Sequence, residues 1–171
     1  MSARVWVTSA VLGGVLFGAM SESGHAPASG GGTALTMAAV PAAGSYTPAS
    51  WASAFLGVIG EPRTSCDLGA IEGWEDAESG GDLGTGLPDD PDVTHNPLNT
   101  ARGEPGSYAI NSDGVQSYPS WSEGLQANAA AITNGLYGGI LAALQAGNNA
   151  QNVADQVTDS PWGTGGFAAT C

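Results

Sequence analysis

The chain has no lysine and few charged residues of any kind. Only 3 of its 171 residues are Lys or Arg, against 16 Asp and Glu, so the formal net charge is −13. Proteins that bind nucleic acid neutralise its phosphates with clustered basic side chains, and this composition excludes nucleic acid as a partner. The 11% of charged residues and the 27 glycines indicate a loop-rich, weakly charged surface, which is typical of exported or virion-borne proteins.

Cysteine and histidine are also scarce. The chain has 2 His and 2 Cys, and neither His25 nor His95 lies near a pair of cysteines, as a zinc site requires. We therefore predict no metal and no other cofactor. An even number of cysteines in an exported chain permits one disulfide, between Cys66 and Cys171, which would tie down the C-terminal residue. Two unpaired thiols are the alternative.

The apolar run near the N-terminus is short for a membrane span. Val5 to Met20 follows Arg4 and precedes Ala26-Pro-Ala28, and this order predicts a secretory signal peptide over residues 1–28. The alternatives are a retained membrane anchor, for which a span of about 20 apolar residues is usual, and an arm that packs against partner chains. The signal predicts a secreted, extracellular or virion-associated protein.

The rest of the chain divides into a linker and one folded domain. Residues 29–46 are almost all Ser, Gly, Ala, Pro and Thr, a composition that predicts a flexible linker. Residues 47–171 carry apolar residues at helical spacing and one short alternating segment. The sequence therefore predicts a mainly helical domain with a small β-hairpin. The expected elements are helices at 47–60, 64–78, 120–136, 140–144 and 153–157, and a hairpin at 107–118 with Asp113-Gly114 at its turn.

The second expected helix ends in an acidic residue just before a pair of glycines. Leu68, Ile71 and Trp74 are three residues apart, and a step of four places Glu78 on the same face. The negative end of the helix dipole and the apolar neighbour Trp74 would both favour the protonated form of this carboxyl group. A glycosidase general acid needs that property. The alternative is an ordinary exposed glutamate at a helix end.

The other acidic residues near this helix end are predicted to face solvent. Glu72, Glu75 and Asp76 fall off the apolar stripe, and we predict a solvated acidic face for them. The stretch from Asp82 to Asp92 does not follow the alternating ligand pattern of a calcium-binding EF-hand loop. An acidic surface loop is the prediction for this stretch.

Four short motifs follow one another along the folded part of the chain. They are Glu78-Ser-Gly-Gly81, Asn96-Pro-Leu-Asn-Thr100, Asn111-Ser-Asp-Gly-Val-Gln-Ser-Tyr-Pro-Ser120 and Ser160-Pro-Trp-Gly163. In this order they resemble the lysozyme-like superfamily, and more closely the phage and actinobacterial wall-lytic domains related to lytic transglycosylases and glucosaminidases. The resemblance spans Trp51 to Gly165, essentially the whole folded part.

The resemblance implies a lysozyme-like (α+β) fold and a site that cleaves peptidoglycan glycan strands. In that site Glu78 would be the catalytic acid, in a groove between the helical lobe and the hairpin. Two residues of the hairpin would face the scissile bond, and three residues of the preceding loop would contact sugars or fix the loop. These residues are Gln116 and Tyr118 on the hairpin, and Asn96, Asn99 and Thr100 in the loop. For each of the five, a purely structural role is the alternative.

The reaction that follows protonation needs a decision about a second carboxylate. Retaining and inverting glycosidases both use one, and Asp113 and Asp82 are the candidates, whereas many transglycosylase-like enzymes use a single acid. The resemblance thus implies a muramidase, glucosaminidase or lytic transglycosylase without choosing among them. The charge of −13 opposes binding to anionic wall polymers. Two alternatives therefore stay open: a non-catalytic structural or adhesion protein of a virion or cell surface, with other virion proteins as partners, and an unrelated binding module.

Overall fold

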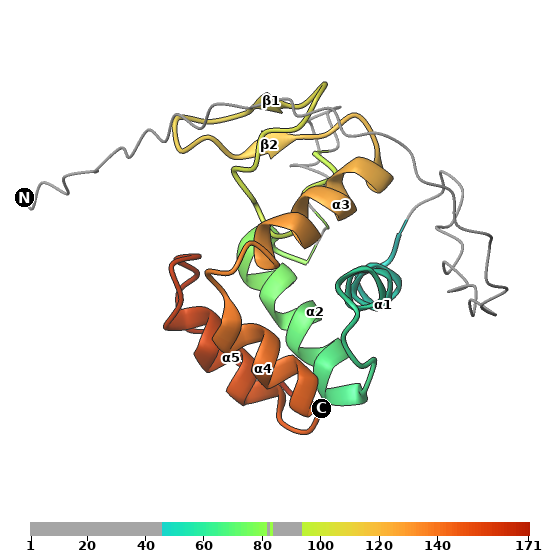
Figure 1. The fold of residues 1–171 in the computed structure, drawn as a ribbon, viewed down its shortest axis with the longest axis vertical. Helices are drawn as coiled ribbons and strands as arrows, with labels where there is room; N and C mark the ends of the chain where they lie inside the picture. The colour runs from blue at the N-terminus through green and yellow to red at the C-terminus, as the bar shows by residue number, and fades with distance from the viewer. Residues whose placement is uncertain (1–45, 82, 84–93) are drawn as a thin grey trace, which may run out of the picture. The chain divides into compact units, whose positions relative to one another are not determined.

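The computed structural model describes residues 46–81, 83 and 94–171, which belong to one compact unit within Met37–Cys171. The predicted signal peptide, nearly all of the predicted linker and Asp82 lie outside the described residues. The described part is mainly helical with one small antiparallel sheet, as the sequence predicts (Figure 1). Its elements are α1 (Pro48–Ile59), α2 (Ser65–Ser79), β1 (Tyr108–Ala109), β2 (Gln116–Ser117), α3 (Trp121–Ile132), α4 (Gly138–Ala146) and α5 (Ala150–Thr158).

The first two helices begin and end where their capping residues predict. Thr47 caps α1 in a reciprocal capping box, Pro48 occupies its first turn, and Gly60 ends it with a φ of 79°. Thr64 caps α2 in the same way, and Gly80 ends that helix with a φ of 75°. A side-chain cap is worth about 1 kcal/mol, so short local signals fix both ends of α2, the helix that carries Glu78.

Helix α2 lies at the centre of the domain. It packs against α1 on one side and α5 on the other, while α3 packs against α1 and α4 against α5 (Figure 1). The helices bury aromatic and aliphatic side chains between them, and Trp51 stacks on Phe55 with ring centroids 5.1 Å apart. Tyr46, the last residue of the predicted linker, is buried and packs edge-on against Trp121.

Helix α3 is shorter than the sequence predicts. The apolar spacing predicts that the helix continues to Leu136 and that Leu136 is part of the core. Instead the helix ends at Ile132 and Leu136 is 65% exposed. The chain turns at Gly135, whose φ is 94°, a conformation that glycine adopts without strain. The prediction for Leu136 is therefore wrong, because a turn redirects the chain before the next helical position.

The acidic face predicted on α2 is only partly correct. Asp76 is exposed, but Glu75 is only 1% exposed. One of its carboxylate oxygens accepts hydrogen bonds from the Ser79 hydroxyl (2.5 Å) and from the Leu83 backbone N–H (2.6 Å). Glu75 is buried because the chain after α2 folds back onto this side of the helix, which helical periodicity does not reveal.

The C-terminal segment runs along α2 as a strap, residues 164–171. Cys171 forms a disulfide with Cys66 in the first turn of α2. A Cβ atom added to Gly69 would lie only 1.9 Å from the Thr170 carbonyl oxygen, and one added to Gly73 would lie 3.2 Å from the Ala168 carbonyl oxygen. These two glycines let the strap backbone approach the helix closely.

Glu61 lies in the turn between α1 and α2, near the Asp67 carboxylate in the first turn of α2. Burial raises the pKa of Glu61 from its ordinary value of 4.5, and the nearby Asp67 carboxylate raises it further. A carboxyl group with a raised folded-state pKa contributes stability below its unfolded-state pKa, and this contribution is lost as pH rises through the folded-state pKa. The parent protein therefore loses part of its stability above about pH 4.5 because Glu61 must ionise.

We expect Glu61→Gln to have a higher melting temperature than the parent at neutral pH, because the variant carries no charge to desolvate at that position. The difference in melting temperature between variant and parent should shrink as the pH falls below the ordinary pKa of glutamate, where the parent also carries a neutral side chain. Thermal unfolding followed by circular dichroism across this pH range measures it. A gap that stays constant with pH would contradict the prediction.

Candidate functional site

Three segments meet around Glu78 at the C-terminal end of α2. Trp74 lies one helical turn before Glu78, so both side chains lie on the same face. The indole Nε1 of Trp74 donates to the Thr164 hydroxyl at 3.0 Å, and that hydroxyl donates to Oε1 of Glu78. Trp74 and Thr164 are buried, whereas Glu78 is partly exposed. A chain of hydrogen bonds thus runs from the core to a carboxyl group at the surface.

The loop before the hairpin is attached to the same helix end. Asn99 adopts a φ of 50°, and its Nδ2 donates to the main-chain carbonyl of Glu78 at 2.5 Å. Carbonyls in the last turn of a helix have no partner inside the helix, so Asn99 supplies one. Trp162 connects this loop to α2. Its Nε1 donates to the Leu98 carbonyl at 3.1 Å, and its ring packs edge-on against Trp74, with ring centroids 5.0 Å apart.

Asn96 is a fully buried residue that holds the loop together. Its Nδ2 donates to the carbonyls of Thr100 (2.9 Å) and Gln116 (2.8 Å). Its Oδ1 accepts from the Thr100 N–H (3.0 Å) and from Nδ2 of Asn128 on α3 (3.1 Å). Asn96 is 0% exposed and Thr100 is 6% exposed. The sequence left two roles open for Asn96 and Thr100, contact with sugars or fixing of the loop. Their contacts match the second role.

We expect Asn96→Ala to destabilise the protein by about 2–3 kcal/mol, because it leaves several buried polar groups without partners. Urea unfolding followed by fluorescence measures this change. Asn148→Ala is the matched control, since Asn148 is exposed and its loss should cost under about 0.5 kcal/mol. Equal stability of the two variants would show that the Asn96 contacts do not hold the loop.

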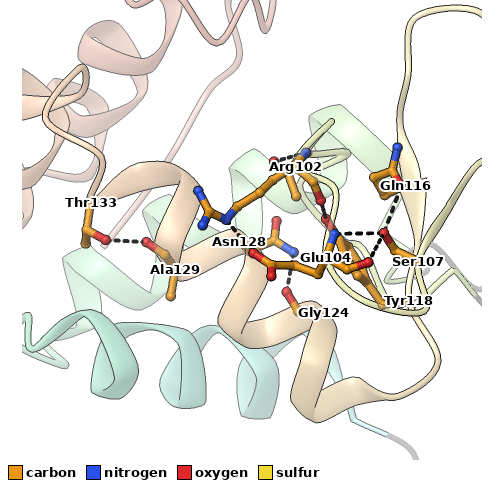
Figure 2. Close-up of polar contacts among 10 residues, drawn as sticks. Arg102, Glu104, Ser107, Gln116, Tyr118, Gly124, Asn128, Ala129 and Thr133 are labelled. Atoms are coloured by element: carbon orange, nitrogen blue, oxygen red, sulfur yellow. Dashed lines mark hydrogen bonds and ion pairs between the residues drawn. The ribbon is translucent and has the colours of Figure 1, made fainter. Parts of the chain in front are cut away.

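Two predicted site residues on the hairpin make hydrogen bonds within the hairpin and to the loop that precedes it (Figure 2). Tyr118 is only 2% exposed, and its hydroxyl donates to the Arg102 carbonyl at 2.6 Å. Burial, with a further effect of the Glu104 carboxylate, raises its pKa to about 12. Gln116 is half-buried, donates to the Gly114 carbonyl at 2.7 Å and accepts from the Ser107 hydroxyl at 2.9 Å. These contacts match a purely structural role for both residues, which was the alternative to a position facing the scissile bond.

The two candidates for a second carboxylate have different outcomes. Asp113 is exposed at the tip of the hairpin, where its backbone N–H donates to the side chain of Asn111 at 3.1 Å. Asp82 lies outside the described residues. Within residues 46–81, 83 and 94–171, no group of three or more His, Cys, Asp or Glu side chains is arranged to hold a metal ion.

A shallow hollow of about 620 Å³ lies elsewhere on the domain, between α5 and the strap. It is lined by polar residues of α5, including Gln151 and Asp155, and by Gly166 to Ala168 of the strap. Gln151 already spans this hollow, since it donates to Asp155 and accepts from the Ala169 N–H. The residues that the sequence singles out gather at the end of α2 and on the hairpin instead.

Thr164 is the residue of this site that the sequence did not identify. The motif Ser160-Pro-Trp-Gly163 ends one residue before it, and a threonine in a Gly-rich tail carries no signal of its own. Only the folding of the strap onto α2 brings its hydroxyl to Glu78. A motif extended by one residue would have included it.

Comparison with models of protein families, with curated proteins and with solved structures finds no match to this chain. Among the described helices, none has the length and apolar character needed to cross a membrane. The geometry around Glu78 and the order of the sequence motifs are therefore the features that bear on function.

Proposed function

We propose that this protein cleaves the glycan strands of peptidoglycan, with a lysozyme-like fold and Glu78 as the general acid. The observation that carries the proposal is the position of Glu78, partly exposed at a helix end and held through one oxygen by a buried threonine. Among the described residues this contact engages only Oε1, which leaves Oε2 to meet a substrate oxygen. A general acid must approach the atom it protonates within about 2.6–3.2 Å.

The proposed reaction begins with transfer of a proton from Glu78 to the oxygen that links two sugars. The bond from that oxygen to the anomeric carbon breaks, and positive charge develops on the sugar ring. Water, or a hydroxyl group of the same sugar, then bonds to the anomeric carbon and releases a proton, which returns to Glu78. Water gives a reducing end, whereas the sugar's own hydroxyl gives an anhydro end.

The surroundings of Glu78 support a polar ligand with apolar faces, such as an amino sugar. The ring of Trp162 packs against Tyr137, with centroids 5.3 Å apart, and against Trp74, with centroids 5.0 Å apart. Trp162 and Tyr137 are partly exposed. The disulfide is compatible with an oxidising extracellular compartment. We therefore place the proposed activity outside the cell or on a virion.

The test is digestion of purified peptidoglycan by the full chain, with mass spectrometry of the soluble products. Release of disaccharide-containing fragments supports the proposal, and reducing or anhydro ends identify the reaction. Because the net charge of −13 repels anionic wall polymers, peptidoglycan freed of those polymers should be digested faster than whole walls at low salt.

A structural or adhesion role with the same fold is the second candidate, and the strong acidity favours it. In that case the folded protein would release no fragments from either substrate. Its co-sedimentation with intact walls or with virion proteins would then identify the surface to which it binds.

A further inference from the structure

We infer that Trp74 and Thr164 are positioning residues that determine which oxygen of Glu78 carries the transferable proton. This inference rests on the proposed function and adds a division of labour between the two carboxyl oxygens. Oε1 is the oxygen that accepts from Thr164, and Oε2 is the oxygen that carries the proton and delivers it to the substrate.

The direction of the hydrogen bonds follows from the chemistry of the three groups. An indole N–H can only donate, so Trp74 makes the Thr164 hydroxyl an acceptor at 3.0 Å. The hydroxyl has a single hydrogen, which is then directed at Oε1 of Glu78. An oxygen that accepts this hydrogen bond is disfavoured as the site of the carboxyl proton, which is therefore placed on Oε2.

The supporting structure holds this arrangement in place. Trp74 is 0% exposed and Thr164 is 8% exposed, so water does not compete well for their hydrogen bonds. The ring of Trp162 packs edge-on against Trp74 at 5.0 Å. The strap that carries Thr164 is tied to the other end of α2 by the disulfide between Cys66 and Cys171. The hydroxyl is thus held by the core of the domain as well as by its own backbone.

Two consequences separate positioning from a merely structural role. A hydrogen bond to the charged form of a carboxyl group favours that form, so its loss should move the alkaline limb of the pH–activity profile to higher pH. Loss of the contact also frees the carboxyl group to rotate, and small misplacements of a catalytic group can cost about 10²-fold in rate. A structural role alone would change stability without moving the pH profile.

The experiment compares Thr164→Val, which keeps the shape and removes the hydroxyl, with Thr164→Ser, which keeps the hydroxyl. We expect Thr164→Val to lower kcat on peptidoglycan fragments by about 10- to 100-fold with KM little changed. Its alkaline limb should move upward, whereas Thr164→Ser should stay within about threefold of the parent. Circular dichroism of both variants checks that they fold. Parent-like kcat and an unchanged pH profile in Thr164→Val would overturn the inference.

A second readout does not depend on activity. The indole N–H resonance of Trp74 in ¹H–¹⁵N spectra should move in Glu78→Gln and in Thr164→Val, because both substitutions alter the hydrogen bonds of the residue that accepts from this indole. The indole of Trp162, which donates to the Leu98 carbonyl, is the internal reference. A Trp74 resonance indifferent to both substitutions would overturn the inference. A Trp74 resonance that responds to both substitutions in a protein that releases no fragments would instead refute the proposed function and retain the contact.

Discussion

Glu78→Gln is expected to reduce the release of soluble glycan fragments from peptidoglycan by about 10²–10⁴-fold, the usual contribution of a general acid. The amide oxygen can still accept the hydrogen bond from Thr164, so the surrounding structure should persist. The amide cannot supply an acidic proton to the linking oxygen, so the chemical step should be lost. Initial rates of fragment release at matched protein concentration measure the effect.

Asp76→Asn is the matched control for this experiment. Asp76 lies on the same helix as Glu78 and is exposed, and its change likewise replaces a carboxyl group by an amide. Parent-like activity in this control, with strong loss in Glu78→Gln, assigns the effect to Glu78 and not to the loss of any carboxyl group from this helix end. Comparable activity of both variants with the parent would remove Glu78 from the catalytic role.

Most of the fold is predictable from sequence because its signals are local. The capping boxes at Thr47 and Thr64 and the left-handed glycines at positions 60 and 80 each depend on residues within one turn. The hairpin is likewise predictable from Asp113-Gly114 between two short alternating segments, and its strands pair in antiparallel register. These features need no knowledge of the distant chain.

The features that sequence reasoning missed arise where another segment covers a helix or where a turn ends the helical pattern. Glu75 is buried because Leu83 folds back onto it, and Thr164 reaches Glu78 across 86 positions of the sequence. Leu136 is exposed because a turn at Gly135 ends the helical pattern. Periodicity along one helix carries no information about which other segment will cover it.

The candidate site shows the same division between local and distant information. Motif order identifies Asn96, Thr100 and Tyr118 as a group, but the alternatives of substrate contact and structural support depend on where each side chain points. Asn96 bonds within its own loop and to two other segments, β2 and α3, and the Tyr118 hydroxyl points to the Arg102 carbonyl. These contacts are properties of the assembled loop and hairpin, so the sequence alone left both roles open.

Removal of the disulfide is expected to cause the largest loss of stability. Cys66 and Cys171 are separated by 105 positions, and in the chain-entropy account a closed loop of about 100 residues contributes about 4.7 kcal/mol by restricting the unfolded chain. The double variant Cys66→Ser/Cys171→Ser should therefore lose about 2–5 kcal/mol in urea unfolding. The double variant avoids the unpaired thiol that either single change would leave.

The same variant should also affect the site, because the disulfide anchors the strap that carries Thr164. If the strap is held by the bond, the double variant under folding conditions should show a broadened or shifted Trp74 indole resonance as well as lower stability. Gly69→Ala provides an independent disturbance of the strap, since a Cβ there would lie 1.9 Å from the Thr170 carbonyl oxygen. Both variants should weaken the contact between Thr164 and Glu78. A double variant with lower stability and an unaltered Trp74 resonance would show that the packing around Trp162 holds Thr164 without help from the disulfide.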